Sequence, residues 1–374
     1  MTIPNGKYGK MSANFLETYR NKKVLITGNT GFKGGWLSQW LLQLNAGITG
    51  YALEPPTSPA LFNYLKLNKN TNAIIGDIRN FEKLKKTIKQ TKPDIIFHLA
   101  AQSIVRESYT NPVDTLETNI NGTINLLEAV RQLKLSTAII IVTSDKCYDN
   151  KEWIYGYREI DPMGGYDPYS VSKGATELIV SAWRNSFFNP KKYQYHGVKV
   201  SSVRAGNVIG GGDWSADRII PDCVRSLEKD EVILIRNPKA TRPWQHVLEP
   251  LGGYLLLGSK LLNEKESTFT YETAFNFGPQ ADNNKTVGEL VNTFLKYWGK
   301  GSWQHIKSND LHEASLLSLN IEKAYHLLDW KPLLNFEHTI EQTANWYKEY
   351  KNNKENSLKF TEGQINKYIT DITF

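Results

Sequence analysis

The chain has 374 residues, of which 40% are hydrophobic and 22% charged, and its formal charge at pH 7 is +7. This length suits one large α/β domain with a smaller lobe, or two domains. The lysines are scattered and no nucleic-acid-binding motif is present, so the sequence argues against a nucleic-acid partner. An anionic small substrate would account for the positive charge equally well.

The two cysteines, Cys147 and Cys223, stand alone, without a CxxC pair or a plausible ligand spacing. The sequence therefore predicts neither a disulfide framework nor a metal site. No segment approaches the roughly 18 uninterrupted apolar residues of a membrane span, and the N-terminus has no charged-then-apolar signal pattern. We expect a soluble cytoplasmic protein without a membrane partner.

Short apolar strands alternate with helical stretches along the first half of the chain. This pattern predicts an α/β fold with a Rossmann-type, doubly wound parallel sheet that is buried on both faces. The expected strands cover residues 22–26, 48–53, 73–75, 95–99, 138–142 and 198–203. The expected helices cover residues 36–42, 81–90, 119–133 and 170–183.

The alternation defines the expected domains. Residues 1–20 are polar and form an N-terminal extension, and residues 21–203 form the nucleotide-binding domain, to which residues 246–278 return. Glycines and prolines interrupt the pattern after about residue 204. We therefore expect a smaller C-terminal substrate-binding lobe from residues 204–245 and 279–350. The charged residues 351–374 are expected to form a surface tail.

A glycine-rich loop, Gly28-Asn29-Thr30-Gly31-Phe32-Lys33-Gly34, lies between the first strand and the first helix. One glycine permits the tight turn, one lets the backbone approach a pyrophosphate, and one allows close helix–sheet packing. The free amides of the helix N-terminus then face the phosphates. The loop predicts a dinucleotide site, with cofactor contacts from Gly28, Thr30, Gly31, Phe32, Lys33 and Gly34.

The spacing Gly-x-x-Gly-x-x-Gly resembles that of extended short-chain dehydrogenases/reductases. In that family the end of the fourth strand wraps around the nicotinamide-side ribose and phosphates, an Asp after the third strand meets the adenine, and an Asn supports the central helix. The resemblance implies that NAD is the cofactor. It carries these roles to Leu99, Ala100, Ala101 and Gln102, to Asp77 and Ile78, and to Asn119.

Glu54 is the acidic residue nearest the end of the second strand. A carboxylate there can accept a hydrogen bond from the ribose 2′-hydroxyl and repel a 2′-phosphate, which favours NAD over NADP. Glu54 could equally be a solvated charge before Pro55 and Pro56, and the sequence leaves both interpretations open.

Five Tyr-x-x-x-Lys pairs occur in the chain, so the pattern alone identifies no active site. Only Tyr169 and Lys173 open a helix and follow a strand that ends at Thr143-Ser144, as in the family. Four residues apart on a helix, the two side chains project from one face. We expect Lys173 to lower the pKa of Tyr169 and to bind the nicotinamide ribose, and Ser144 to share the substrate's hydroxyl with Tyr169.

Asp145 and Lys146 follow Ser144 directly. In sugar-nucleotide epimerases of the family these positions are usually small and inert, whereas in 4,6-dehydratases they are an acid and a base, as elimination of water demands. Asp145 fits the acid. Lys146 fits the base if burial and Lys173 favour its neutral amine, and otherwise it stabilises the enolate. Two solvated loop charges are the alternative.

Longer segments resemble the sugar-nucleotide 4,6-dehydratases that act on CDP-glucose. These segments are residues 27–36, 50–62, 143–150, 163–173, 202–214 and 236–249. The resemblance implies a CDP-glucose substrate, a role in 3,6-dideoxyhexose and O-antigen synthesis, and a homodimer or dimer of dimers that pairs through the Tyr169 helix. No physical feature of the sequence by itself favours cytosine over another base.

Two lobe segments supply the expected substrate contacts. Arginine forks suit a diphosphate, which points to Arg218 and Arg242. Asn207 is expected to bind the diphosphate or sugar, and Trp214 and His246 to flank the nucleotide, although Trp214 could instead fill the lobe core. The expected substrate-binding set is Gln102, Ser144, Asn207, Trp214, Arg218, Arg242 and His246.

The sequence therefore predicts a redox-neutral dehydration. Tyr169 removes the proton of the C4 hydroxyl while hydride passes from C4 to NAD, Lys146 and Asp145 assist loss of water across C5–C6, and hydride returns to C6. Two alternatives stay open. One is a sugar-nucleotide 4-epimerase or other extended family member, which would leave Asp145 and Lys146 unexplained. The other is a non-catalytic NAD-binding regulator, a class that often lacks the Tyr or the Lys.

Overall fold

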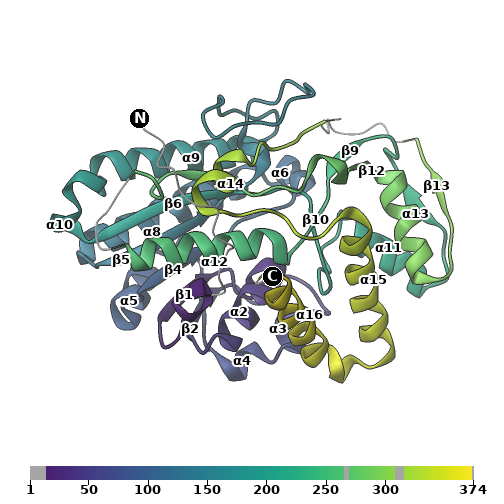
Figure 1. The fold of residues 1–374 in the computed structure, drawn as a ribbon, viewed down its shortest axis with the longest axis horizontal. Coiled ribbons are helices and arrows are strands. Elements are labelled where there is room, and N and C mark those ends of the chain that lie inside the picture. The colour runs from purple at the N-terminus through teal and green to yellow at the C-terminus, as the bar shows by residue number, and fades with distance from the viewer. Residues whose placement is uncertain (1–13, 265–268, 308–315, 373–374) are drawn as a thin grey trace.

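The structure is a computed structural model that describes residues 14–264, 269–307 and 316–372. Its centre is a parallel seven-stranded sheet in the order β11-β6-β5-β4-β1-β2-β3 (Figure 1). The strands are β1 (Lys23–Thr27), β2 (Gly47–Ala52), β3 (Asn72–Ile75), β4 (Ile95–His98), β5 (Thr137–Val142), β6 (Val198–Arg204) and β11 (Ala274–Asn276). The predicted doubly wound α/β fold is confirmed, and the strand order reverses beside β1, where such sheets bind ligands.

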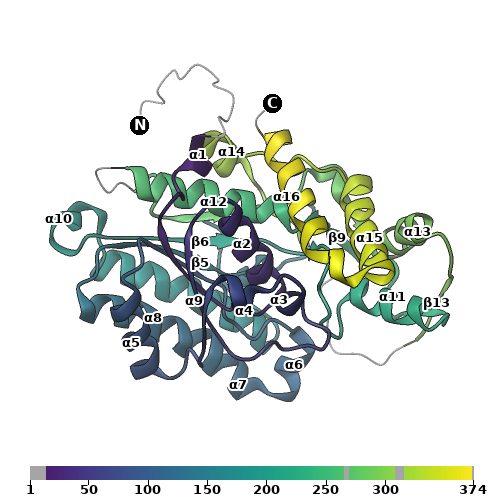
Figure 2. The same cartoon turned by 90° about the horizontal axis from the view of Figure 1, so that it is seen from below.

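Helices cover both faces of the sheet. One apolar layer joins Val24 and Ile26 of β1 to α1 (Asn14–Glu17), α2 (Phe32–Gln43) and α12 (Leu248–Asn263). The other layer joins Leu25 to α5 (Phe81–Thr91), α8 (Gly122–Leu133) and α9 (Pro168–Ser186). Figure 2 shows α5 and α8 on the opposite side of the sheet from α1 and α12. Alternate residues of each strand thus face opposite layers, which explains the continuous apolar runs.

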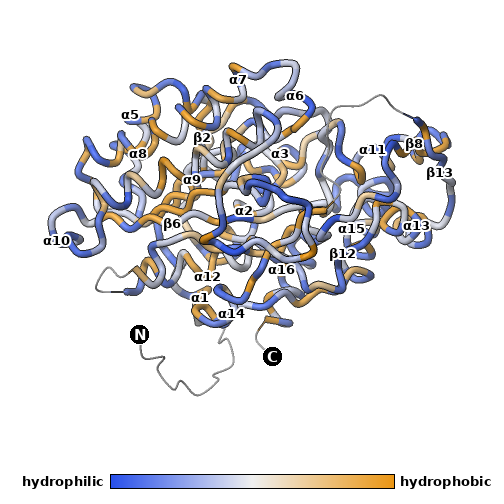
Figure 3. The backbone as a smooth tube through the Cα atoms, turned by 90° about the horizontal axis from the view of Figure 1, so that it is seen from above, coloured by the Kyte–Doolittle hydropathy of each residue, from blue (hydrophilic) through white to orange (hydrophobic). Residues whose placement is uncertain are grey.

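The residues assigned to return to this domain supply α12 and the edge strand β11, which pairs with β6. The hydrophobic strand β6 lies between α9 and α12 (Figure 3). The helix α9 begins at a sharp N-cap, because the Asp167 carboxylate accepts from the Ser170 amide at 2.9 Å and Pro168 opens the first turn. This cap places Tyr169 at the start of the helix.

The smaller lobe is built from short strands and helices. Its two-stranded pairs are β7 (Val208–Ile209) with β10 (Gln245–His246), β8 (Ile233–Ile235) with β13 (Trp303–His305), and β9 (Thr241–Pro243) with β12 (Asn284–Thr286). The helices α11 (Ile219–Glu228), α13 (Val287–Trp298) and α15 (Phe336–Asn352) pack around them (Figure 1). Shorter helices are α3 (Leu61–Tyr64), α4 (Leu67–Asn70), α6 (Val105–Thr110), α7 (Pro112–Leu116), α10 (Tyr193–His196) and α14 (Glu322–Leu328).

The expected surface tail is wrong. Residues Ser357–Ile372 form the helix α16, which packs against α15 and the cofactor-side helix α2. Its buried positions include Thr361, Ile365, Tyr368 and Ile372, which recur every three or four residues. The Tyr368 ring meets Trp40 of α2 edge-on, with 5.6 Å between the ring centres. This helical spacing is present in the sequence, but the surrounding charged residues obscure it.

The expected extension is also partly incorporated into the core. Phe15, Leu16 and Tyr19 are buried, and the Tyr19 hydroxyl donates to the Leu255 carbonyl of α12 at 2.6 Å. Residues 1–13 of that extension lie outside the described residues. No helix in the described part of the chain is both long and apolar enough to span a membrane.

Candidate active site

A cavity of about 1170 Å³ lies at the carboxyl ends of the central strands, between the sheet and the smaller lobe. Its wall contains every residue that the sequence analysis assigned to cofactor, chemistry or substrate except Asn119, Trp214 and His246. Residues from both domains and from widely separated segments therefore converge on one site.

The glycine loop forms one end of the cavity largely from main chain. Gly28 has a positive φ of 77°, and a Cβ there would lie 2.7 Å from the Ala100 amide nitrogen. A Cβ on Gly34 would lie 2.1 Å from the Gly28 carbonyl oxygen. Gly31 differs, because a Cβ there would meet no protein atom nearer than 3.5 Å. Packing therefore requires glycine at positions 28 and 34. Gly31 instead leaves open space at the start of α2 that fits a pyrophosphate.

The neighbouring residues fit the adenosine end of a dinucleotide. The Thr30 hydroxyl donates to the Leu53 carbonyl at 3.0 Å and so fixes the loop against the end of β2. Glu54 follows that strand, is exposed and lines the cavity. Asp77 also lines the cavity. The Arg79 guanidinium forms an ion pair with the Asp77 carboxylate at 2.7 Å and lowers the pKa of Asp77. Contacts of Glu54 with ribose and of Asp77 with adenine stay predictions.

Asn119 lies behind the cavity wall and connects it to α9. Its side chain accepts from the Gln102 amide at 2.8 Å and donates to the Gln102 carbonyl at 3.0 Å and to the Ser172 hydroxyl at 2.8 Å. It sits in a single π-turn, Glu117–Asn121, that precedes α8, a local distortion often found at functional sites. Gln102 lines the cavity, and its side-chain amide donates to the Thr115 hydroxyl at 2.8 Å.

Tyr169, Lys173 and Ser144 converge at the middle of the cavity, and all three are buried. The expectation that Lys173 lowers the pKa of Tyr169 is not met. Burial raises the pKa of Tyr169 to about 12, and the Ser144 hydroxyl, which hydrogen-bonds to the phenol, acts in the opposite direction. The Lys173 ammonium lies over the ring, 5.8 Å from its centre, and burial lowers its own pKa to about 8. Desolvation therefore outweighs the local charges at both groups.

Asp145 and Lys146 occupy a single 3-10 turn beside Ser144. The Asp145 carboxyl is 2% exposed, and its Oδ1 accepts from the Ser144 hydroxyl at 3.0 Å. Its Oδ2 has no hydrogen-bond partner among the described residues and occupies the space above Gly206, where a Cβ would lie 1.7 Å away. Lys146 is half-buried in the cavity wall. Asp145 also lines the cavity wall, and a buried carboxyl oxygen without a partner there suits proton exchange with a ligand.

Lys33 of the glycine loop also reaches this region. Burial, and then the nearby Arg218 guanidinium, lowers its pKa to about 7, whereas the Asp145 carboxylate acts in the opposite direction. Lys33 thus places a titratable amine between the glycine loop and the 3-10 turn of Asp145 and Lys146, which we call the acid–base turn.

The lobe supplies basic groups to the far end of the cavity. Arg218 precedes α11, pairs with the Asp213 carboxylate at 2.9 Å and donates to the Ser103 hydroxyl at 3.0 Å. Arg242 lies on β9 and Asn207 follows β6 with a positive φ of 48°, and both line the cavity. This cationic end matches the two negative charges of a diphosphate.

Trp214 and His246 are not brought to the cavity. Trp214 is 7% exposed and packs against Tyr347 and Tyr350, with ring centres 5.2 and 4.9 Å away. His246 is fully buried against Trp36, and burial lowers its pKa to about 3. The geometry favours the alternative that Trp214 fills the lobe core. His246 is instead buried against α2.

Several polar residues of the cavity wall carry no signal in the sequence. They lie in loops and helix ends without a characteristic spacing, so only the fold brings them together. They include Arg79, Ser103, Arg106, Asp213, Arg225 and Arg236. Among the described residues, no three His, Cys, Asp or Glu side chains cluster as a metal site would require.

Comparison with known proteins identifies the family. A sequence model of GDP-mannose 4,6-dehydratase matches residues 25–343. The chain belongs to the GDP-mannose 4,6-dehydratase family. Within it, the chain is 48% identical over 356 residues to the CDP-glucose 4,6-dehydratase of Salmonella typhimurium, covering 95% of this chain and 98% of that protein. It is 24% identical over 345 residues to the CDP-paratose 2-epimerase of Salmonella typhi, covering 87% and 98%. The resemblance to sugar-nucleotide dehydratases is confirmed.

Solved structures that are less than 25% identical to this chain share its fold. An epimerase from Methanothermobacter thermautotrophicus has a TM-score of 0.75 at 22% identity, covering 92% of this chain and 97% of that one. A dTDP-glucose 4,6-dehydratase from Bacillus anthracis in complex with NAD has a TM-score of 0.71 at 24% identity, covering 89% and 97%. The shared fold thus extends over nearly the whole chain, including the lobe.

Proposed function

We propose that this protein is a CDP-glucose 4,6-dehydratase that uses NAD and produces CDP-4-keto-6-deoxy-D-glucose. The observation that carries the proposal is the presence of Asp145 and Lys146 beside Tyr169 and Lys173 in one cavity. The 48% identity to the Salmonella CDP-glucose enzyme supports the choice of nucleotide. The fit of the glycine loop to a pyrophosphate supports the cofactor. An epimerase needs the tyrosine and the lysine but has no use for an additional acid and base.

Oxidation at C4 needs a group that removes the hydroxyl proton. Bound NAD would supply reversible hydride transfer, from C4 of the sugar at the start and to C6 at the end. Tyr169 accepts the C4 hydroxyl proton, and Ser144 holds the same oxygen by a hydrogen bond. Because burial raises the pKa of Tyr169 to about 12, its phenolate needs cations nearby, and Arg218 acts in this direction.

Elimination then removes water across C5–C6. The C4 ketone acidifies the C5 hydrogen. Lys146 accepts this hydrogen as a proton, and the ammonium so formed stabilises the enolate. The Asp145 carboxyl protonates the departing C6 hydroxyl, so the C6–O bond breaks and water leaves. A proton returned to C5 completes the product. The overall change is the loss of one water molecule, and no external reductant is consumed.

The direct test compares CDP-, dTDP-, GDP- and UDP-glucose with NAD and the purified protein. We expect CDP-glucose to give the alkali-developed chromophore of a 4-keto sugar and a product mass lower by one water. The variant Lys146→Met should reduce that rate at least about 100-fold, the lower range for loss of general acid–base catalysis. Lys151→Met is the matched control, because Lys151 is exposed and lies outside the cavity wall.

The alternatives give different results in the same assay. A C4 epimer without water loss would identify an epimerase. Bound dinucleotide without turnover of any sugar nucleotide would identify a regulator. Full-rate elimination by Lys146→Met would contradict the role given to that lysine.

The proposed assembly is a homodimer or dimer of dimers that pairs through α9. This helix presents Val171 and Leu178 to solvent, with 45% and 62% exposure, on the side away from Tyr169 and Lys173. Apolar side chains exposed on one helix face are typical of a subunit contact. Sedimentation at the monomer mass would refute this. A cytoplasmic location and a role in O-antigen synthesis stay predictions.

A further inference from the structure

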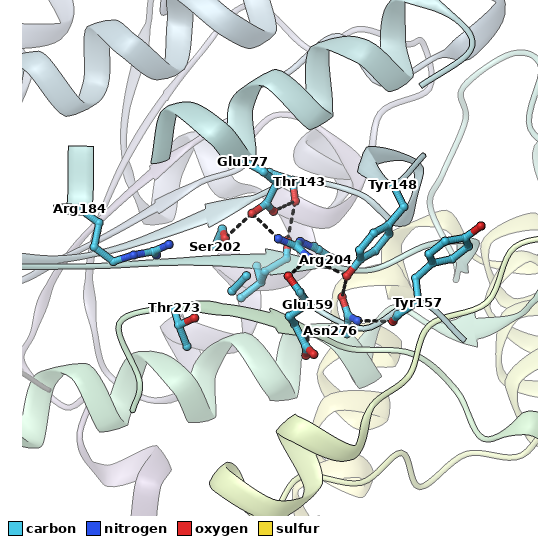
Figure 4. Close-up of polar contacts among 12 residues, drawn as sticks. Thr143, Tyr148, Tyr157, Glu159, Glu177, Arg184, Ser202, Arg204, Thr273 and Asn276 are labelled. Carbon is cyan, nitrogen blue, oxygen red and sulfur yellow. Dashed lines mark hydrogen bonds and ion pairs between the residues drawn. The ribbon is translucent and has the colours of Figure 1, made fainter. Parts of the chain in front are cut away.

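A buried ion pair lies beneath the acid–base turn. Glu177 of α9 and Arg204 at the end of β6 approach to 2.9 Å, and each side chain is 4% exposed (Figure 4). Neither residue belongs to the cavity wall, so neither can touch a bound ligand there. A buried ion pair adds little net stability, because the attraction is offset by the cost of removing both charges from water. Its presence therefore calls for another role.

Glu177 connects the helix α9, which carries Tyr169 and Lys173, to the segment after β5 that carries Ser144. It lies four residues beyond Lys173 and eight beyond Tyr169, which places all three on one face of α9. Its carboxylate accepts from the Thr143 hydroxyl at 2.5 Å and from the Ser202 hydroxyl at 2.7 Å (Figure 4). Thr143 is the residue before Ser144. This bond thereby links the position of Tyr169 and Lys173 to the position of Ser144.

Arg204 contacts the other end of the segment that contains Ser144, Asp145 and Lys146. Its guanidinium donates to the Tyr148 hydroxyl at 2.6 Å, and Tyr148 follows the turn that contains Asp145 and Lys146. The Tyr148 hydroxyl in turn donates to Asn276 of β11 at 2.8 Å (Figure 4). The residues Ser144 to Cys147 are thus attached at both ends to one ion pair, and the turn between those attachments carries the groups that exchange protons.

We propose that the Glu177–Arg204 pair is a positioning device that sets Ser144, Asp145 and Lys146 against Tyr169 and Lys173. This inference rests on the proposed dehydratase function, because it concerns the elimination step. A displacement of about 1 Å in a catalytic group can cost roughly 100-fold in rate, so a rigid attachment has a kinetic consequence even where it adds little stability. Thr143 lies in the cavity wall next to Ser144, whereas Glu177, Arg204 and Tyr148 lie behind that wall. All four act through the turn and are positioning residues.

The test removes, in separate variants, the two hydroxyl groups that donate to the Glu177 carboxylate. Thr143→Val deletes the hydrogen bond to the catalytic segment, whereas Ser202→Ala deletes an equivalent bond from β6. Both variants keep the charge of Glu177, which matters because that charge also raises the pKa of Lys173. We expect Thr143→Val to lower kcat about 10- to 100-fold with the KM for CDP-glucose unchanged. Thr143→Ser should restore kcat, and Ser202→Ala should stay within about threefold of the wild type.

Equal effects of Thr143→Val and Ser202→Ala on kcat would overturn the proposal and leave the pair a purely structural role. Tyr148→Phe removes the hydrogen bond from Arg204 and tests that attachment independently, in case Thr143→Val lowers the melting temperature too far. We expect Tyr148→Phe also to lower kcat at constant KM. An unchanged kcat in Tyr148→Phe would count against the device. The wild type is assayed in parallel with CDP-glucose. Its inactivity would contradict the proposed function, whereas active wild type beside fully active variants overturns only the positioning role.

Discussion

The two halves of the cavity are built by different means. The dinucleotide half is largely main chain, and its defining requirement is the absence of side chains at Gly28 and Gly34. The acid–base half is made of side chains, and Ser144, Asp145 and Lys146 depend for their placement on residues that never reach the cavity. A site formed by backbone can be specified by a short local motif, whereas a site formed by side chains needs support from several distant segments.

This difference predicts that a methyl group added to either half has opposite consequences. In the cofactor half the methyl group should weaken NAD binding and leave the acid–base groups intact. In the acid–base half the methyl group should leave NAD binding unchanged and slow the loss of water.

Gly28→Ala should have the largest effect. Its positive φ disfavours alanine, and the new Cβ would lie 2.7 Å from the Ala100 amide nitrogen, so the loop must move away from β4. Strain and overpacking of about 1–3 kcal/mol each predict a loss of NAD affinity of 100-fold or more, together with a lower melting temperature. Isothermal titration with NAD and thermal unfolding measure the two quantities.

Gly31→Ala separates the fold from the ligand. A Cβ there meets no protein atom nearer than 3.5 Å, so the melting temperature should stay within about 2 °C of the wild type, an exposed-site effect. Cofactor affinity should still fall, because the methyl group occupies the space offered to the pyrophosphate. If Gly31→Ala binds NAD as tightly as the wild type, the pyrophosphate does not lie against this residue.

Gly206→Ala tests the acid–base half. The added Cβ would overlap the Asp145 Oδ2, 1.7 Å away, and must turn that carboxyl out of its place. We expect the rate of water loss to fall about 100-fold with NAD affinity unchanged, in the range for loss of one general acid. Gly363→Ala on α16 is the matched control, since a Cβ there contacts nothing within 4 Å. An unaltered elimination rate in Gly206→Ala would remove Asp145 from the mechanism.

The sequence specified the sheet and the cofactor loop well because both follow local rules. Apolar runs separated by helical stretches predict the six strands from β1 to β6, and the glycine spacing predicts the loop that follows β1. Tyr169 and Lys173 were distinguished from four other Tyr-x-x-x-Lys pairs only by their position after a strand and at a helix start. Context, rather than the residue types, carried that prediction.

What the sequence could not predict depends on contacts between distant segments. Glu177 stands one helical turn beyond Lys173, which is a usable signal, but its partner Arg204 lies 27 residues away on a strand. Tryptophan is a residue type that often stacks on a nucleotide base. Trp214 instead packs on Tyr347, because α15 returns to the lobe. The pKa of Tyr169 was wrongly predicted because local charges can be read from a sequence and burial cannot.

A buried acid that belongs to neither half of the cavity supplies a fourth prediction. Glu249 of α12 is fully buried and accepts from the Leu333 and Leu334 amides at 2.9 and 2.6 Å and from the Tyr368 hydroxyl of α16 at 2.8 Å. Burial outweighs these hydrogen bonds and raises its pKa to about 7. The folded protein thus holds this proton more tightly than the unfolded chain does. The stability associated with it is present below about pH 4.5 and is lost as the pH rises toward 7.

Glu249→Gln removes this titration while it keeps a polar group of the same size. We expect the melting temperature of the wild type to fall by a few degrees more than that of the variant between pH 5 and pH 8, since each unit of pKa shift is worth about 1.4 kcal/mol. Calorimetry of both proteins at the two pH values measures the difference. NAD affinity and kcat at a fixed pH should be the same in both, because Glu249 lies outside the cavity wall. Parallel melting curves at both pH values would mean that Glu249 keeps its ordinary pKa and that hydrogen bonds compensate fully for its burial.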